Sequence, residues 1–331
     1  MEKARVSRRT ILSALGLGIA SATLPAWAQA TAWKPARPVR LINGFSAGGS
    51  ADLLCRILAE ALRPLLGQSV IVETKPGANG FIAAEAVARA APDGLTIGLA
   101  TMSMLAIAPQ LPGLKLPINT QTELTPIGSI AGIYSLLVSP ADAPFRTVPD
   151  LIAYAKAHPG AISYASAGTG STPHMAGELF RRQANIDIVH VPYKGGSQAL
   201  IDLMAGRVNI LIGNMPDFLP QVKSGALRAI AFGGERASPA LPGVPLIKNW
   251  LPRYSVNNWF GIVGPAHLPE SITTALSNAL QAALADPSVR NKMIDLGAEV
   301  VPGTPAQLQK MIDEERLRWG EVIRAANIRV E

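Results

Sequence analysis

The stretch VRLINGFSAGGSADLLCRILAEAL, residues 39–62, decides which fold the sequence predicts. An apolar run predicts a β-strand that reaches Phe45, and the five small residues at 46–50 predict a loop. Apolar residues then recur at the spacing of an amphipathic helix, namely Leu53, Leu54, Ile57, Leu58 and Leu62. Strand, glycine loop and helix in this order begin an α/β unit.

The loop at 46–50 has the composition of an anion site. Its glycines let the backbone approach a ligand closely, and the helix start leaves N–H groups unpaired at the positive end of the helix dipole. The loop lacks the lysine of a P-loop and the GxGxxG of dinucleotide folds, so a carboxylate is favoured over a phosphate. The alternative is that the loop is only a structural turn.

Length and composition describe a globular chain. With 331 residues, 48% hydrophobic and 16% charged, it predicts about two domains with ample core. Lys3, Arg5, Arg8 and Arg9 against Glu2 contribute +3 of the formal net charge of +7. The remaining +4 is spread out without a basic run interleaved with aromatic residues, so nucleic-acid binding is not expected. Cys55, the only cysteine, excludes an intramolecular disulfide and is expected to be a small buried residue.

Residues 1–30 are typical of an export signal. The charged segment SRRTIL at 7–12 leads into an apolar segment at 11–24. Arg8 and Arg9 match a twin-arginine signal, and the alternative is an ordinary Sec signal that carries two arginines.

Small residues near the end of this segment predict where the signal is cleaved. A-x-A patterns end at Ala28 and at Ala30, so we expect cleavage near one of them and a periplasmic mature protein. No later apolar run is long enough to span a bilayer, so we expect a soluble mature protein without direct membrane insertion.

Strands alternate with helices along the rest of the chain, which predicts βαβ units and mostly parallel sheets. Strands are expected at 69–75, 95–101, 162–168, 187–194, 208–214, 227–233 and 258–265, and helices at 80–90, 148–157, 173–184, 198–206, 218–223, 270–285, 289–296 and 305–326. Ligands bind at the carboxyl ends of parallel strands. The glycine loops at 46–50 and 168–172 and the turn at Ser103 leave from such ends, and a third loop at 195–197 repeats the pattern.

The apolar segment 126–140 predicts one long strand, or two strands that cross between domains. A second crossing is expected near 256–261, because the last helices need the first sheet to cover. We therefore expect a discontinuous first lobe at 31–131 and 258–331, a second lobe at 132–257, and a ligand cleft between them.

Catalytic and metal-binding interpretations have less support. Ser171 and His174 lie three residues apart, but no GxSxG motif is present, so a helix cap and a first-turn histidine are the simpler roles. The four histidines lack HxxxH and HExxH spacing, so no metal is expected, and no motif calls for a cofactor. Asp52 is either a helix-start carboxylate or a hydrogen-bond acceptor for the loop or a ligand.

Three aromatic residues lie near predicted strand ends. Phe45, Tyr193 and Trp259 either belong to the core or form walls of a pocket.

Two long segments, 37–97 and 162–214, are similar to the extracytoplasmic receptors of tripartite tricarboxylate transporters, the TctC-like Bug family. The motifs PGANG at 76–80, SAGTGSTPH at 166–174 and VPYKGG at 191–196 carry the resemblance, which covers the mature chain. It implies a two-lobed periplasmic-binding-protein fold, type II-like, each lobe a mostly parallel sheet flanked by helices. It also implies a carboxylate held between the lobes, partly through bridging waters.

The resemblance, together with the strand ends and the aromatic residues, gives a set of expected ligand-binding residues. These are Phe45, Ser46, Ala47, Gly48, Gly49, Ser50, Asp52, Ser103, Ser166, Ala167, Gly168, Thr169, Gly170, Ser171, His174, Tyr193, Gly195, Asn214 and Trp259. Neither of the two major loops contains Lys or Arg, so backbone N–H groups, hydroxyls and water are expected to hold the anion.

The chain departs from the family pattern at several of these positions. Gly44 and Ser46 stand where the family's P-F-P-A-G-G loop has prolines, and Ser50 and Ala51 stand where it has Gly-Thr. Gly213 precedes Asn214 where the family commonly has aspartate. These changes leave open a ligand other than the commonest dicarboxylates.

The favoured function is a monomeric, non-catalytic periplasmic solute-binding protein. It would capture a di- or tricarboxylate, an acidic amino acid or an aromatic acid, and deliver it to the membrane permease subunits of a tripartite transporter. One alternative is a secreted serine hydrolase using Ser171 or Ser50, and another is a ligand-binding accessory protein for a sensor kinase.

Overall fold

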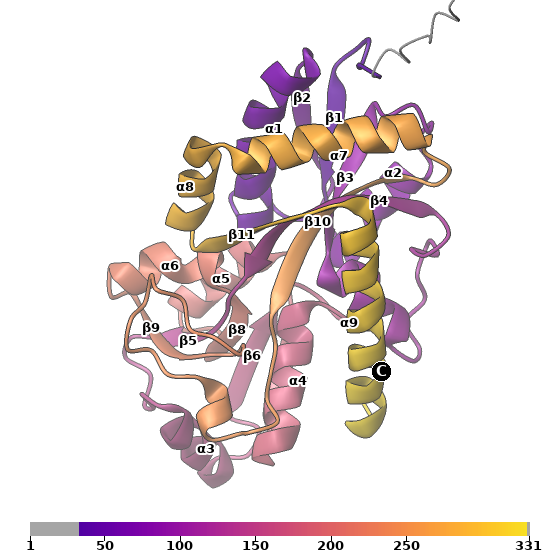
Figure 1. Ribbon diagram of the computed structural model, residues 1–331. Helices are drawn as coiled ribbons and strands as arrows, with labels where there is room; N and C mark the ends of the chain where they lie inside the picture. Colours follow the sequence, from indigo (N-terminus) through magenta and orange to yellow (C-terminus); the bar gives the residue numbers. More distant parts are fainter. Residues whose placement is uncertain (1–32, 330–331) are drawn as a thin grey trace, which may run out of the picture. The chain divides into compact units, whose positions relative to one another are not determined.

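The computed structural model describes residues 33–329 (Figure 1). The expected export signal at 1–30 lies outside the described residues. Trp33–Glu331 forms one compact unit that holds two β-sheets with helices packed on them.

The first sheet has six strands in the order β11-β4-β10-β3-β1-β2. Their bounds are β1 Val39–Asn43, β2 Val70–Thr74, β3 Thr96–Thr101, β4 Leu124–Ile133, β10 Asn258–Pro265 and β11 Ala298–Gly303. The second sheet has five strands in the order β7-β6-β8-β5-β9. Their bounds are β5 Ser135–Pro140, β6 Ile162–Ser166, β7 Ile188–Pro192, β8 Ile210–Asn214 and β9 Leu227–Phe232.

The helices connect these strands much as the alternating pattern predicts. They are α1 Ser50–Leu66, α2 Phe81–Ala88, α3 Val148–Ala157, α4 Thr172–Ala184, α5 Gly196–Met204, α6 Met215–Lys223, α7 Glu270–Ala285, α8 Pro287–Asp295 and α9 Pro305–Ala325. Short 3₁₀ turns lie at Ala78–Gly80, Ala108–Gln110 and Ile247–Asn249. A π-helical segment, Ser103–Ile107, follows β3 where only a turn was expected.

Both sheets are mixed rather than mostly parallel. In the first sheet β1 pairs in parallel with β2 and β3, whereas the pairs β10–β3, β10–β4 and β11–β4 are antiparallel. In the second sheet β6 pairs in parallel with β7 and β8, whereas β5 is antiparallel to both its neighbours. The parallel pairs come from local βαβ units, which force that direction. The antiparallel pairs involve β5 and β10, which the chain reaches from the other sheet, and β11, which lies at the edge of the first sheet.

The chain passes between the sheets twice within residues 33–329. β4 ends at Ile133 in the first sheet and β5 begins at Ser135 in the second, so the first passage lies at Tyr134. β9 ends at Phe232 and β10 begins at Asn258, so the second passage is the segment 233–257. The lobe boundaries at 131/132 and 257/258 stay a prediction, because the described residues form one compact unit.

The strand β11 is missing from the sequence prediction, which has only helices after residue 265. It forms because a short segment with two valines follows Gly297, whose left-handed φ of 86° turns the chain back after α8. β11 then covers the edge of β4 at Ala298 and Val300. Such pairing between distant segments leaves little local signal.

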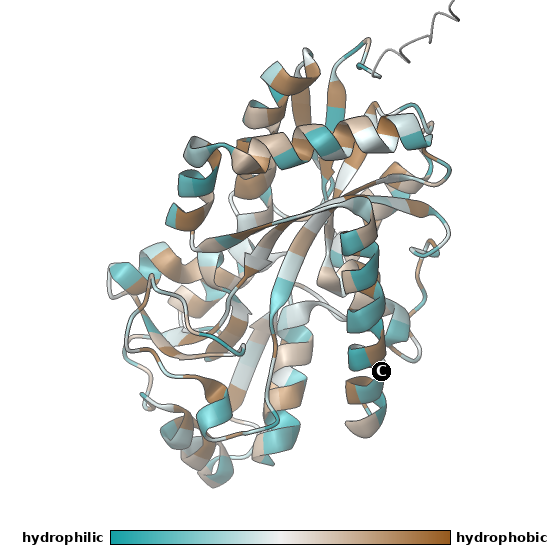
Figure 2. Cartoon of the chain, viewed as in Figure 1, coloured by the Kyte–Doolittle hydropathy of each residue, from teal (hydrophilic) through white to brown (hydrophobic). Residues whose placement is uncertain are grey.

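The α1 helix shows why its sequence pattern folds as it does. Leu54, Cys55 and Leu58 are fully buried and belong to a cluster that includes Leu276 and Leu280 of α7. The single cysteine is therefore a core residue, and burial raises the pKa of its thiol. In Figure 2 the strands of the first sheet are mainly white to brown, while α7 and α9 carry hydrophilic bands.

A glycine in the middle of α4 lets this helix lie close to β6. A Cβ on Gly177 would collide with the ring of the fully buried Tyr164. The hydroxyl of that tyrosine donates to Glu178 Oε1 at 2.8 Å. This contact holds α4 against β6, and Ser171 caps the start of the same helix.

We expect Gly177→Ala to destabilise the protein by about 1 to 3 kcal/mol, because the added methyl overpacks the Tyr164 ring. Thermal and urea unfolding measure this. The matched control is Gly320→Ala in α9, where a Cβ would meet only the flexible ends of Gln110 and Arg324. That change should be neutral or stabilising by up to about 1 kcal/mol, since alanine favours helix. Equal effects of the two changes would contradict the packing argument.

Candidate functional site

A pocket lies where the carboxyl ends of β1, β3, β6 and β8 approach one another beside β10. Its lining residues come from both sheets, and they are Phe45, Ser46, Gly49, Ser50, Ala51, Asn79, Thr101, Ser103, Ala167, Ser171, Thr172, Pro173, Gly196, Ser197, Ala199, Leu211, Gly213, Asn214, Asp217, Phe218, Asn258 and Phe260. Its volume is about 40 Å³. That is room for a few water molecules. A ligand of several carbons needs a wider pocket.

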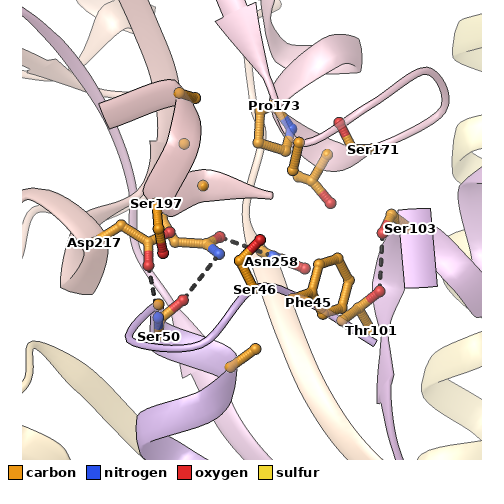
Figure 3. A pocket seen from close by; sticks show the side chains of 18 of the residues that line it. Phe45, Ser46, Ser50, Thr101, Ser103, Ser171, Pro173, Ser197, Asp217 and Asn258 are labelled. Carbon is orange, nitrogen blue, oxygen red and sulfur yellow. Dashed lines mark hydrogen bonds between the residues drawn. The ribbon is translucent and has the colours of Figure 1, made fainter. Parts of the chain in front are cut away.

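Hydrogen bonds join the two sheets across this pocket (Figure 3). The backbone N–H of Ser50 donates to Asp217 Oδ1 at 2.6 Å, and Asn214 Nδ2 donates to Ser50 Oγ at 3.2 Å. Asn258 Nδ2 donates to Asn214 Oδ1 at 2.9 Å. Ser197 Oγ donates to the Ala47 carbonyl at 3.3 Å. The glycine loop after β1 is thus bonded to the starts of α5 and α6.

Three helix starts converge on Asp217. Ser50 is the first residue of α1, Gly196 is the first residue of α5, and Asp217 itself lies in the first turn of α6. A Cβ on Gly196 would lie 2.9 Å from Asp217 Oδ2, so only glycine gives the carboxylate this space. Burial raises the pKa of Asp217, against the opposing effect of its bonds from Ser50 and Asn214. Helix dipoles favour the ionised carboxylate at this position.

Another part of the pocket contains polar atoms without partners. Asn79 and Thr172 are 5% and 4% exposed, and within the described chain Asn79 Nδ2 and Thr172 Oγ1 make no hydrogen bond. Ser103 Oγ donates to Asn79 Oδ1 at 3.2 Å and lies 2.8 Å from Thr101 Oγ1. Asn79 also has a left-handed φ of 53°, imposed by the PGANG turn. A buried, unpaired polar group is costly unless a ligand or water pairs with it.

The charge of the pocket is unusual for an anion site. Among the described residues that line it, Asp217 is the only one with an ionisable side chain. No Lys, Arg or His of residues 33–329 contributes to the lining. Any anion bound there must therefore be held by dipoles, hydroxyls, amides and water.

Comparison with known proteins supplies the family. Residues 54–328 match the model of the tripartite tricarboxylate transporter family receptor, TctC. The chain belongs to this family. The resemblance seen in the sequence is confirmed.

Solved structures of similar proteins support the same family. The periplasmic binding protein BugD is 32% identical, with a TM-score of 0.85 over 90% of this chain and all of that one. A protein of R. palustris with adipate is 33% identical, with a TM-score of 0.86 over 89% and 99% of the two chains. MatC from Rhodopseudomonas palustris, with bound malate, is 29% identical, with a TM-score of 0.84 over 87% and 99%. These neighbours confirm the two-lobed α/β fold.

The structure of this receptor places eight of the expected ligand-binding residues in the pocket lining. They are Phe45, Ser46, Gly49, Ser50, Ser103, Ala167, Ser171 and Asn214. They come together because each lies just after β1, β3, β6 or β8, at the end of the strand or at the start of the helix that follows it. That they contact a ligand stays a prediction.

Other expected residues lie outside the lining and have partners of their own. Asp52 accepts from the Gly48 N–H and pairs with Arg56 at 2.9 Å, so it is a hydrogen-bond acceptor for the loop. Ser166 Oγ lies 2.7 Å from His190 Nε2, and Tyr193 Oη donates to Asp202 at 2.7 Å.

The remaining expected residues are spread around the pocket rather than in it. Ala47 and Gly48 line a neighbouring groove with Leu53. Thr169 and His174 open into a separate cavity beside Glu178, Arg181 and Arg182. Gly168, Gly170, Gly195 and Trp259 do not line the pocket.

Several lining residues were missed by the sequence reasoning. Asn79 and Thr172 lie inside the PGANG and SAGTGSTPH motifs, so the motifs carried a signal for them. Asp217 follows a strand end as part of Asn-Met-Pro-Asp, a helix-start pattern that gave no hint of its partner. Its contact with Ser50 joins residues 167 positions apart.

The two serines considered for hydrolysis have other roles. Ser171 Oγ accepts the N–H of His174 as the cap of α4, and the ring Nδ1 of His174 accepts from the Gly170 N–H at 3.2 Å. Burial lowers the pKa of His174. Ser50 Oγ accepts from Asn214. Within the described chain neither serine hydroxyl is paired with a histidine ring.

Between residues 33 and 329, no helix is long and apolar enough to cross a membrane. The same residues contain no group of three or more His, Cys, Asp or Glu side chains placed to hold a metal ion.

We expect Asp217→Asn to change how stability depends on pH. Because the pKa of Asp217 is raised in the folded state, the folded protein binds this proton more readily than the unfolded chain. Its contribution to stability therefore falls as pH rises from the ordinary aspartate range through the raised pKa. The melting temperature of Asp217→Asn minus that of wild type should increase over this window and then level off. A difference that is constant with pH would contradict this account.

Proposed function

We propose that this chain is a non-catalytic periplasmic receptor that captures a small carboxylate and delivers it to the membrane component of a tripartite tricarboxylate transporter. One observation carries the proposal. Two buried polar groups that have no partner among residues 33–329, Asn79 Nδ2 and Thr172 Oγ1, line one pocket together. Asn79 lies in the turn before α2, and Thr172 is the first residue of α4. The two groups therefore come from segments that belong to different sheets.

The energetics of these two groups favour a carboxylate. An unpaired buried donor costs about 1 to 3 kcal/mol, and a hydrogen bond to a charged partner contributes about 1.5 to 3 kcal/mol. A carboxylate offers two oxygens, enough to accept from both donors at once. The start of α4 adds a positive helix end at the same place.

The relatives give further support for this ligand class. Adipate is bound to the similar R. palustris protein and malate to MatC, and both are carboxylates. The family is that of tripartite tricarboxylate transporter receptors, which supports a membrane permease as partner. We propose that the receptor acts as a monomer in the periplasm.

Ligand entry requires the pocket to widen beyond its volume of about 40 Å³. We propose that two lobes, 31–131 with 258–331 and 132–257, separate to admit the ligand. Tyr134 and the segment 233–257 would be the hinges, because only there does the described chain pass from one sheet to the other.

We expect Thr172→Val to weaken carboxylate binding by roughly ten- to a hundredfold, because it removes a hydroxyl that bonds a charged ligand. The unliganded variant should melt at or above the wild-type temperature, since the buried hydroxyl has no partner to lose. Thermal shift with a carboxylate panel, followed by calorimetry on the best ligand, measures both effects.

The control for this experiment is Thr120→Val. Thr120 is 7% exposed and its hydroxyl is also unpaired within the described residues, but it lies beside Leu124 in a different cavity. It should leave ligand affinity unchanged. Wild-type affinity in Thr172→Val would overturn the proposed role of this pocket.

Export is tested separately. Protein recovered from the periplasm should begin after Ala28 or Ala30, as measured by intact mass. Replacing Arg8 and Arg9 by lysines should retain the precursor in the cytoplasm if the twin-arginine route is used. Normal export of that variant would instead indicate the Sec route, and an intact mass that includes Met1 would contradict cleavage.

A further inference from the structure

The pocket has two chemically different ends. Figure 3 shows Asp217, Ser197 and Ser50 on one side and Thr101 and Ser103 on the other. We call the first the acid end, because it contains the pocket's ionisable side chain.

The second we call the donor end. It adds the unpaired Asn79 amide, which lies against Ser103. The Thr172 hydroxyl, also unpaired within the described residues, lines the same pocket. A ligand that spans the pocket meets a carboxylate at one end and vacant donors at the other.

At the acid end the anion position of α1 is already filled. The Ser50 N–H, first in that helix, donates to Asp217 Oδ1 at 2.6 Å. Asp217 Oδ2 lies against the start of α5 at Gly196. The chain's own carboxylate thus occupies the place where a glycine loop and a helix start would otherwise receive a ligand carboxylate.

A second carboxylate at this end would either be repelled or have to share a proton with Asp217, and both cost binding free energy at neutral pH. Two carboxylates within hydrogen-bond distance cannot both stay ionised without a compensating cation. The lining supplies none from the described residues, because it contains no Lys, Arg or His. A hydroxyl or an amine meets no such penalty, since either group donates to a carboxylate.

From these contacts we infer that the receptor selects a ligand with a single carboxylate, bound at the donor end, and a hydrogen-bond donor, hydroxyl or amine, directed at Asp217. The inference rests on the proposed function and names its ligand class. It sets this chain apart from its similar structures with adipate and malate, each of which has a carboxylate at both ends of the ligand.

The test uses ligands matched in length that differ only at one end. Wild-type protein at neutral pH is titrated by calorimetry with adipate, ω-hydroxyhexanoate and ω-aminohexanoate. The shorter series is succinate, γ-hydroxybutyrate and γ-aminobutyrate. In the series whose chain length fits the pocket, the hydroxy acid or the amino acid should bind at least about tenfold more tightly than the diacid. A preference for the amine shows an ionised Asp217, and a preference for the hydroxyl shows hydrogen bonding alone.

Variants connect the preference to this side chain. Asp217→Asn and Asp217→Ser should each raise the affinity for the diacid and lower the affinity for the matched ω-amino acid. The ratio of amino-acid affinity to diacid affinity should therefore fall at least about tenfold. Two variants are used so that the result does not depend on one of them folding. The control is Asp142→Asn in the exposed turn after β5, which removes the same charge outside the linings of the pocket and of the neighbouring groove and should leave the ratio unchanged.

The outcomes separate this inference from the proposed function. If wild-type protein binds diacids as tightly as their hydroxy and amino partners, and the Asp217 variants keep that ratio, the inference is overturned while the carboxylate receptor stands. If no carboxylate of either series or of the thermal-shift panel binds wild-type protein, the proposed function fails and the inference fails with it.

Discussion

The hydrogen bond from the Ser50 N–H to Asp217 is the contact on which the pocket depends. It exists because α1 begins directly after a glycine loop, which leaves its first N–H unpaired, and because Pro216 starts α6 with Asp217 in its first turn. Asn214 and Asn258 extend the contact into a short chain of hydrogen bonds. Two sheets that share only two passages of the described chain are thereby joined at the ends of their strands.

Much of the fold could be predicted because the local spacing of apolar residues indicates helices and strands. The bounds of α3, α7 and β10 agree with the sequence prediction, and the segment around Tyr134 does cross between sheets. The direction of β5 and β10 and the existence of β11 could not be predicted in the same way. They depend on pairing with strands far away in the sequence, which hydrophobic alternation does not report.

In the candidate site too, some residues could be predicted from local sequence signals and others depend on distant contacts. Ser50, Ser103 and Ser171 were found because strand ends and glycine loops mark them locally. Asp217 was missed because its hydrogen-bond partner, the Ser50 N–H at the start of α1, lies 167 residues away in the sequence. Gly213 lines the pocket at the position where the family resemblance implied an aspartate, and the carboxylate of the described lining is that of Asp217 in the first turn of α6. Local motifs therefore located the pocket, and tertiary contact determined its charge.

The small volume of the pocket has a kinetic consequence. In the proposed opening of the two lobes, the hydrogen bonds of Ser50, Asn214 and Ser197 across the pocket separate before a ligand larger than a few waters enters or leaves. The rate of that separation would then set an upper limit on how fast a bound ligand dissociates. A partner that stabilised the separated state would raise this rate, which would make the lifetime of the complex a property that the partner controls.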